Sequence, residues 1–152
     1  MKNSLRLALS ALISIAATGA VAGERVGDFA LIDHQGAQHH MAWYDDQEAV
    51  VILPQGVGVT DAQALAALQD LQAQYAAQNV KFFLLNPGLQ TDRDAVAADL
   101  DAEMPVLMDD AQIVSEALGL SNMDEAVVYS PKSFRLFIAD LYRTNWRRRS
   151  IA

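Results

Sequence analysis

A glycine-rich loop in front of a predicted helix is the first place in this chain where chemistry could occur. Residues 55–60 read Gln-Gly-Val-Gly-Val-Thr and stand between an apolar run and an amphipathic pattern. The backbone N–H groups at a helix N-terminus favour an anion, so this loop could bind a small one. The alternative is a tight turn in which Thr60 caps the helix and Val59 fills space. The chain contains no cysteine, so the loop has no thiolate for nucleophilic or redox chemistry.

Three histidines, His34, His39 and His40, offer a second possibility. His39 alternates with Met41 on one face of a predicted strand, so His34, His39 and Met41 could bind a copper or zinc ion. Three ligands on one short hairpin give no preset geometry. The alternative is a polar hairpin at a solvated sheet edge.

Clustered carboxyl groups are a third possibility, because a pair of them could act as general acid and general base. The clusters are Asp45-Asp46, Asp99-Asp101-Glu103 and Asp109-Asp110. They fall at predicted turns and helix caps, where aspartate is favoured for backbone reasons. Neither a nucleophile elbow nor a phosphate-binding loop is present.

The elements that must position these residues alternate between strand and helix. Two continuous apolar runs, 49–53 and 80–85, predict parallel strands buried on both faces, with a helix from Thr60 between them. This order favours an α/β, thioredoxin-like fold with a central parallel sheet and a closing antiparallel hairpin. The expected strands are 26–33, 38–43, 49–53, 80–85, 105–108, 126–129 and 134–137, and the expected helices begin at 60, at 91 and at 109–110.

The third helix shows its ends in the sequence. Asp109 or Asp110 should cap its start, and Gly119 should end it in a left-handed conformation with Leu120 folded back on the last turn. The side chains expected to point inward are Ile113, Val114, Ala117 and Leu118.

The N-terminus has the build of a secretory signal peptide. Lys2 and Arg6 precede an apolar run over residues 7–17, and Ala20-Val21-Ala22 supplies a small-residue cleavage pattern. The alternative is an uncleaved membrane anchor, although a span needs about 20 apolar residues. We therefore expect a periplasmic or secreted protein with a leader over 1–22, one domain over 23–137 and an atypical basic tail over 138–152.

The predicted domain is strongly acidic. Residues 23–137 contain 18 acidic and 5 basic side chains, a net charge of −13, whereas residues 138–152 contain four arginines and one aspartate. Such a body repels nucleic acid and anionic membrane surfaces, so nucleic acid is not an expected partner. An exported chain without cysteine has no disulfide, so apolar burial must stabilise its fold.

Four stretches of this chain resemble the redoxins, which comprise the alkyl hydroperoxide reductase/thiol-specific antioxidant (AhpC/TSA) group and its thioredoxin-like periplasmic relatives. They are similar, in order, to the opening strand, the first turn, the central strand with its active-site loop, and the segment before the closing hairpin. The stretches are Val26–Leu31, His34–Gly36, Ala49–Gly58, and Val106–Asp109 with Ala117–Leu120. The resemblance covers residues 26–137 and implies a thioredoxin-like fold with thiol peroxidase or thiol-disulfide oxidoreductase activity.

The residues that carry the chemistry of these families are missing. By the resemblance, the attacking cysteine would fall at Val59, a second cysteine at Ala62 and a cis-proline near Asp124. The resemblance thus implies a degenerate active-site loop made of Gly56, Val57, Gly58, Val59, Thr60 and Ala62.

The C-terminus also departs from the resemblance. Redoxins continue after the last hairpin with a closing helix, whereas here charge and pattern change at Ile138. We expect an incomplete helix and a sheet face left uncovered, through which the chain could self-associate. The arginines at 143 and 147–149 with Trp146 could contact anionic lipid; the alternative is a non-native end from a frameshift or truncation.

Three functions remain open from the sequence. The first is a redox-inactive binding or scaffold domain, or a decayed paralogue, with a protein or small-molecule partner and no cofactor. The second is an oxidoreductase of the thiol families that uses another nucleophile. The third is a periplasmic metal-binding module built on His34, His39 and Met41.

Overall fold

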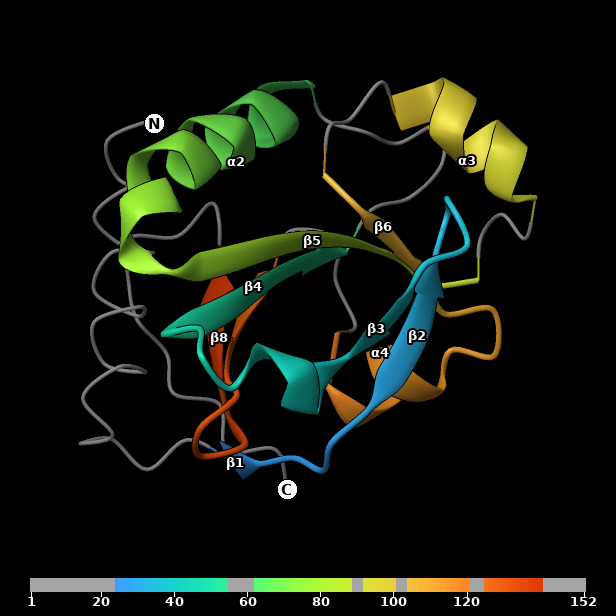
Figure 1. The fold of residues 1–152 in the computed structure, drawn as a ribbon. Helices are drawn as coiled ribbons and strands as arrows, with labels where there is room; N and C mark the ends of the chain where they lie inside the picture. Colours follow the sequence, from blue (N-terminus) through green and yellow to red (C-terminus); the bar gives the residue numbers. More distant parts are fainter. Residues whose placement is uncertain (1–23, 55–61, 89–91, 101–103, 121–124, 141–152) are drawn as a thin grey trace.

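The described part of the chain is built on one eight-stranded mixed sheet. The computed structural model describes residues 24–54, 62–88, 92–100, 104–120 and 125–140. Its strand order is β1-β8-β7-β4-β5-β6-β2-β3 (Figure 1). The strands are β1 (Glu24–Arg25), β2 (Ala30–Asp33), β3 (Gln38–His40), β4 (Ala49–Pro54), β5 (Val80–Asn86), β6 (Val106–Met108), β7 (Glu125–Ser130) and β8 (Arg135–Asp140).

The centre of the sheet matches the prediction from the apolar runs. β4 and β5 pair in parallel from Ala49 opposite Val80 to Pro54 opposite Leu85. All six residues of β4 are buried, as expected for strands covered on both faces. Helix α2 (Ala62–Tyr75) connects them, followed by the 3-10 turn η2 (Ala76–Gln78). The prediction of two central parallel strands with a helix between them is confirmed.

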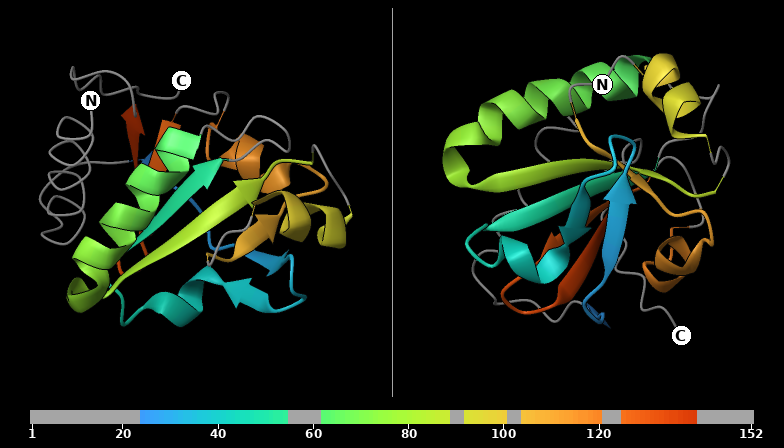
Figure 2. Two further views of the ribbon diagram at one scale, coloured as in Figure 1. Left: turned by 90° about the horizontal axis from the view of Figure 1, so that it is seen from above. Right: turned by 45° about the vertical axis from the view of Figure 1, so that its right-hand side comes forward.

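Helices lie on both faces of the sheet (Figures 1 and 2). α2 and α3 (Arg93–Leu100) lie over one face, whereas α4 (Ile113–Ala117) lies on the other side. The core beneath α4 joins side chains of β4, β5 and β7, among them Ile52, Phe83 and Tyr129. None of the described helices is long and apolar enough to cross a membrane.

The first hairpin is shorter than its sequence predicts. β2 pairs antiparallel with both β3 and β6, but residues 41–44 leave the strand and form the 3-10 helix η1 (Met41–Tyr44). The strand prediction for 41–43 is therefore wrong. Met41 is fully buried and its N–H donates to the Phe29 carbonyl, so burial of this side chain turns the backbone inward.

The closing strands run further than expected. β8 continues to Asp140 and pairs with β7, with Ile138 opposite Val127. β8 therefore includes Ile138, the residue at which the charge pattern of the sequence changes. β1, which the sequence did not predict, pairs with the start of β8.

Helix α4 begins at Ile113, with Gln112 at its N-cap position in place of the predicted Asp109 or Asp110, although Asp109 still hydrogen-bonds to its first turn. The Asp109 carboxylate accepts hydrogen bonds from the N–H groups of Val114 and Ser115. Gly119 has a φ of +65°, and the Leu120 N–H donates to the Ser115 carbonyl as the predicted fold-back requires. Val114 and Leu118 are buried as expected, but Ile113 is 69% exposed and Ala117 is also exposed. The helix has only five residues, so it buries a narrower face than four inward positions assume.

Candidate functional site

The two stretches that the resemblance assigns to a degenerate active site join the sheet at one edge. Ile52 of β4 stands opposite Val127 of β7 in an antiparallel register. The carboxyl end of β4 and the start of β7 therefore lie at the same edge of the sheet. Residues 56–60 and Asp124 lie outside the described residues, so their roles stay predictions, and Ala62 is the first residue of α2.

A second candidate is a hydrogen-bonded cluster of Asp33, His39 and Tyr44. The Nε2 atom of His39 lies 2.8 Å from Oδ2 of Asp33, and its Nδ1 atom lies 2.6 Å from the Tyr44 hydroxyl. An ionised carboxylate only accepts, so Nε2–H donates to Asp33 and, in the neutral ring, Nδ1 accepts from Tyr44. The Phe83 ring closes the cluster in an edge-to-face arrangement with His39, with the two ring centroids 4.9 Å apart.

The backbone of the β2–β3 turn completes this cluster. Oδ1 of Asp33 accepts from the N–H groups of Gln35 and Ala37, each at 2.9 Å. Burial by itself raises the pKa of Asp33, but the hydrogen bonds from His39, Ala37 and Gln35 outweigh burial, so the net pKa is below its ordinary value. Asp33 is therefore a charged carboxylate that accepts three hydrogen bonds.

The Tyr44 hydroxyl of this cluster is held in its protonated form. Burial, and then the Asp33 charge, raise the pKa of Tyr44 above its ordinary value. A tyrosine that attacks as a free phenolate needs the opposite shift. Sequence analysis placed Asp33 at the end of a predicted strand and missed its link to Tyr44, because that link depends on the unpredicted η1 helix.

The structure gives the three proposed metal ligands separate environments. The Nδ1 atom of His34 accepts from the Val106 N–H at 3.2 Å, both ring nitrogens of His39 are hydrogen-bonded, and Met41 is fully buried. Within the described ranges no group of three or more His, Cys, Asp or Glu side chains could hold a metal ion. The remaining histidine, His40, lies 3.2 Å from the Asp28 carboxylate and against the Trp43 ring.

The described acidic pairs serve the backbone or face solvent. Asp109 is buried and hydrogen-bonds to the first turn of α4, whereas Asp45, Asp46 and Asp110 are exposed. In the 99–103 cluster, residues 101–103 lie outside the described part. The geometry thus offers no pair of carboxyl groups facing a common site among the pairs it describes.

Comparison with known proteins finds likeness in structure alone. No protein-family model matches the chain, and no curated protein matches it. A hypothetical protein from Sinorhizobium meliloti superposes with a TM-score of 0.61 at 24% identity, over 76% of this chain and 68% of its own. A candidate thiol:disulfide interchange protein DsbE from Chlorobium tepidum gives 0.65 at 18% identity, over 78% and 84% of the two chains.

An exposed lipoprotein thioredoxin from Streptococcus pneumoniae gives a TM-score of 0.61 at 20% identity, over 74% of this chain and 87% of its own. These identities are too low to carry an activity across. They show that the fold predicted from the sequence is correct: the chain has a thioredoxin-like fold.

Proposed function

We propose that this protein is an exported thioredoxin-like domain that carries out no thiol chemistry and acts as a binding or scaffold domain, or survives as a decayed paralogue. The observation that carries the proposal is the absence of cysteine from the whole chain on a fold whose solved neighbours include thiol-disulfide oxidoreductases. Thiol–disulfide exchange requires a thiolate, and no residue of this chain can supply one.

Two finer assignments belong to the same proposal. The motifs between Val26 and Leu120 favour descent from the AhpC/TSA redoxins, and the leader over residues 1–22 favours export to the periplasm. Residues 56–60 are then the remnant of the active-site loop, with Val59 at the position of the attacking cysteine.

An oxidoreductase with a different nucleophile has less support. Among the described residues, the Tyr44 hydroxyl is the side chain best placed beside a histidine, and its raised pKa works against attack. A metal-binding module has no support from the geometry either, since His39 already uses both ring nitrogens.

Assays of insulin disulfide reduction and of thiol-dependent peroxide consumption test the proposal with the purified full chain. We expect rates equal to those of buffer, because no thiolate exists. Reduction of either substrate that persists after repeated purification, and disappears on unfolding, would overturn the proposal.

Export is tested separately. The chain is expressed in a bacterium with its leader, the periplasm is collected, and the mass of the protein found there is measured. We expect a chain that begins at Gly23. An intact chain held in the membrane fraction would favour the uncleaved anchor instead.

A further inference from the structure

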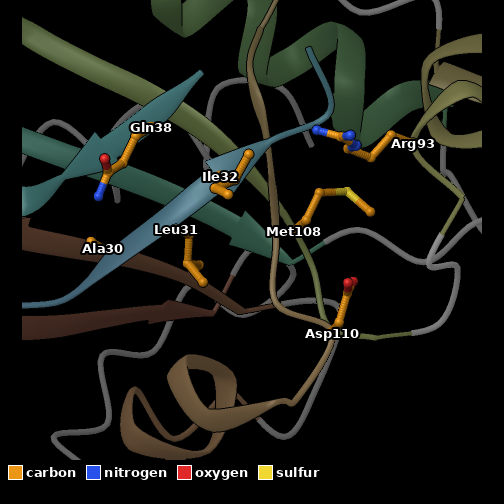
Figure 3. Close-up of a pocket in the computed structure, with 7 residues that line it drawn as sticks. All are labelled: Ala30, Leu31, Ile32, Gln38, Arg93, Met108 and Asp110. Atoms are coloured by element: carbon orange, nitrogen blue, oxygen red, sulfur yellow. The ribbon is translucent and has the colours of Figure 1, made fainter. Parts of the chain in front are cut away.

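An open groove lies over β6, β2 and β3, on the side of the sheet opposite β1. It has a volume of about 440 Å³, within the range of small-molecule sites in proteins. Figure 3 shows its lining, which β2, β3, β6, α3 and the segment after β6 contribute. The lining residues are Ala30, Leu31, Ile32, Gln38, Arg93, Met108 and Asp110.

The floor of the groove is a row of side chains across three strands. Ile32 of β2 stands opposite Met108 of β6 on one side and opposite Gln38 of β3 on the other. Residues in register project from the same face of a sheet. Ile32 is 50% exposed, so the floor presents an apolar surface to solvent.

One cation stands over this floor. Arg93 is the first residue of α3, and its guanidinium makes no hydrogen bond or ion pair with any residue in the described ranges. Its guanidinium lies against the β2–β3 turn, where a Cβ on Gly36 would come within 3.2 Å of Nη1. Gly36 has a φ of +88°, so this turn favours glycine, and the absent side chain leaves room for the guanidinium.

One anion lies further along the lining. Asp110 follows Met108 after β6 and is exposed, and Figure 3 places Met108 between Asp110 and Arg93. A ligand carboxylate is therefore favoured near Arg93, where the guanidinium can bind it with two parallel hydrogen bonds. A second negative charge on the ligand would meet Asp110 and the acidic body of the protein.

We propose that this groove is a binding site for small monocarboxylates with an unbranched apolar chain, with the carboxylate on Arg93 and the chain along Ile32 and Met108. The site does not depend on the proposed lack of thiol chemistry, because it uses none of residues 55–62. The class follows from a cation that pairs with none of the described residues, the exposed Ile32 beside Met108, and a nearby carboxylate that disfavours dicarboxylates.

Titration of the full chain with octanoate, followed by amide chemical shifts, tests this site. We expect saturable shifts concentrated at residues 30–32, 38, 93 and 108. Octan-1-ol should bind at least about tenfold more weakly, because it lacks the charge, and suberate should also bind more weakly. Decanoate should bind more tightly than octanoate, by about three- to fourfold per added methylene while the chain stays in the groove.

Two arginine variants distinguish octanoate binding in this groove from nonspecific attraction of the anion to positive charge. Arg93→Gln should weaken octanoate binding about tenfold or more with an unchanged fold, because Arg93 is exposed. Arg25→Gln is the matched control, since Arg25 is exposed on β1 at the opposite edge of the sheet. Asp110→Asn should bring suberate binding closer to that of octanoate.

Three results would overturn the proposal: no saturable binding of octanoate, shifts located away from the groove, or equal losses in the two arginine variants. None of them bears on the redox assays, so this proposal and the proposed function fail independently.

Discussion

At the scale of single residues, the hydrogen bonds of Asp33 tie the first hairpin to the core. Replacing Asp33 with Asn removes the charge that His39 and two backbone N–H groups contact. We expect Asp33→Asn to lower the free energy of unfolding by about 2 kcal/mol, measured by urea denaturation at neutral pH. Asp45→Asn, at an exposed turn position, is the control and should change little.

The lowered pKa of Asp33 also predicts a dependence on acid. The carboxylate stabilises the folded state at any pH above its unfolded value of about 3.9, and that contribution is lost as the pH falls through the lower folded value. Between pH ~5 and pH ~2, the free energy of unfolding should fall less in Asp33→Asn than in the unchanged chain. Equal losses in both proteins would contradict this role.

Replacing Tyr129 and Tyr44 with phenylalanine should have different effects on stability. The Tyr129 hydroxyl is fully buried and hydrogen-bonds to none of the described groups, whereas Tyr44 bonds to His39. Tyr129→Phe should leave stability unchanged or raise it by about 1 kcal/mol, and Tyr44→Phe should lower it by about 1 kcal/mol. Thermal melting of the pair decides this, and a large loss in Tyr129→Phe would show that its hydroxyl has a partner.

Alkaline unfolding gives a second test of Tyr129. Burial, and then the charge of Asp28, raise the pKa of Tyr129 to about 12. Because the folded state holds the Tyr129 proton more tightly than the unfolded chain, this tyrosine does not lower the free energy of unfolding below the unfolded pKa of about 10. Above it, the free energy of unfolding falls as the pH rises toward the folded value. Tyr129→Phe should therefore lose less stability than the unchanged chain between pH ~10 and pH ~12.

At the scale of elements, the sequence predicts the strands that are buried on both faces. It does not predict segments whose conformation depends on tertiary contacts. The apolar runs of β4 and β5 predicted their strands, their pairing and the helix between them. The turn of residues 41–44 into η1 could not be predicted, because it depends on Met41 entering the core. The Asp33–His39–Tyr44 cluster was missed for the same reason. Two of the four positions predicted to point inward in α4, Ile113 and Ala117, are exposed because the helix has only five residues.

The C-terminus of α4 gives a prediction at this scale. Gly119 has a φ of +65° and its N–H donates to the Glu116 carbonyl. Gly119→Ala should cost about 1 kcal/mol, because a Cβ is unfavourable in this conformation. Gly27→Ala is a matched control, since a Cβ there meets nothing within 4 Å. Equal melting temperatures for the two variants would contradict the assigned cap.

At the scale of the whole molecule, the sequence predicts a weakly packed C-terminus. Residues 141–152 lie outside the described part, and the arginines at 143 and 147–149 oppose deep burial because each would need a partner. We expect early trypsin cleavage at these positions and self-association in size-exclusion chromatography. A tail that resists trypsin in a monomer with a sharp melting transition would show that this end is a packed part of the fold.

The central proposal is that residues 56–60 are the remnant of an active-site loop whose reactive thiol has been lost. The Val59→Cys variant tests it most directly, because it restores a cysteine where the resemblance places one. The pKa of the new thiol is measured from the ultraviolet absorbance of its thiolate against pH. An inherited site predicts a value clearly below the ordinary value of about 8.5, since a helix N-terminus stabilises the thiolate, and a thiol that titrates at about 8.5 would contradict the account.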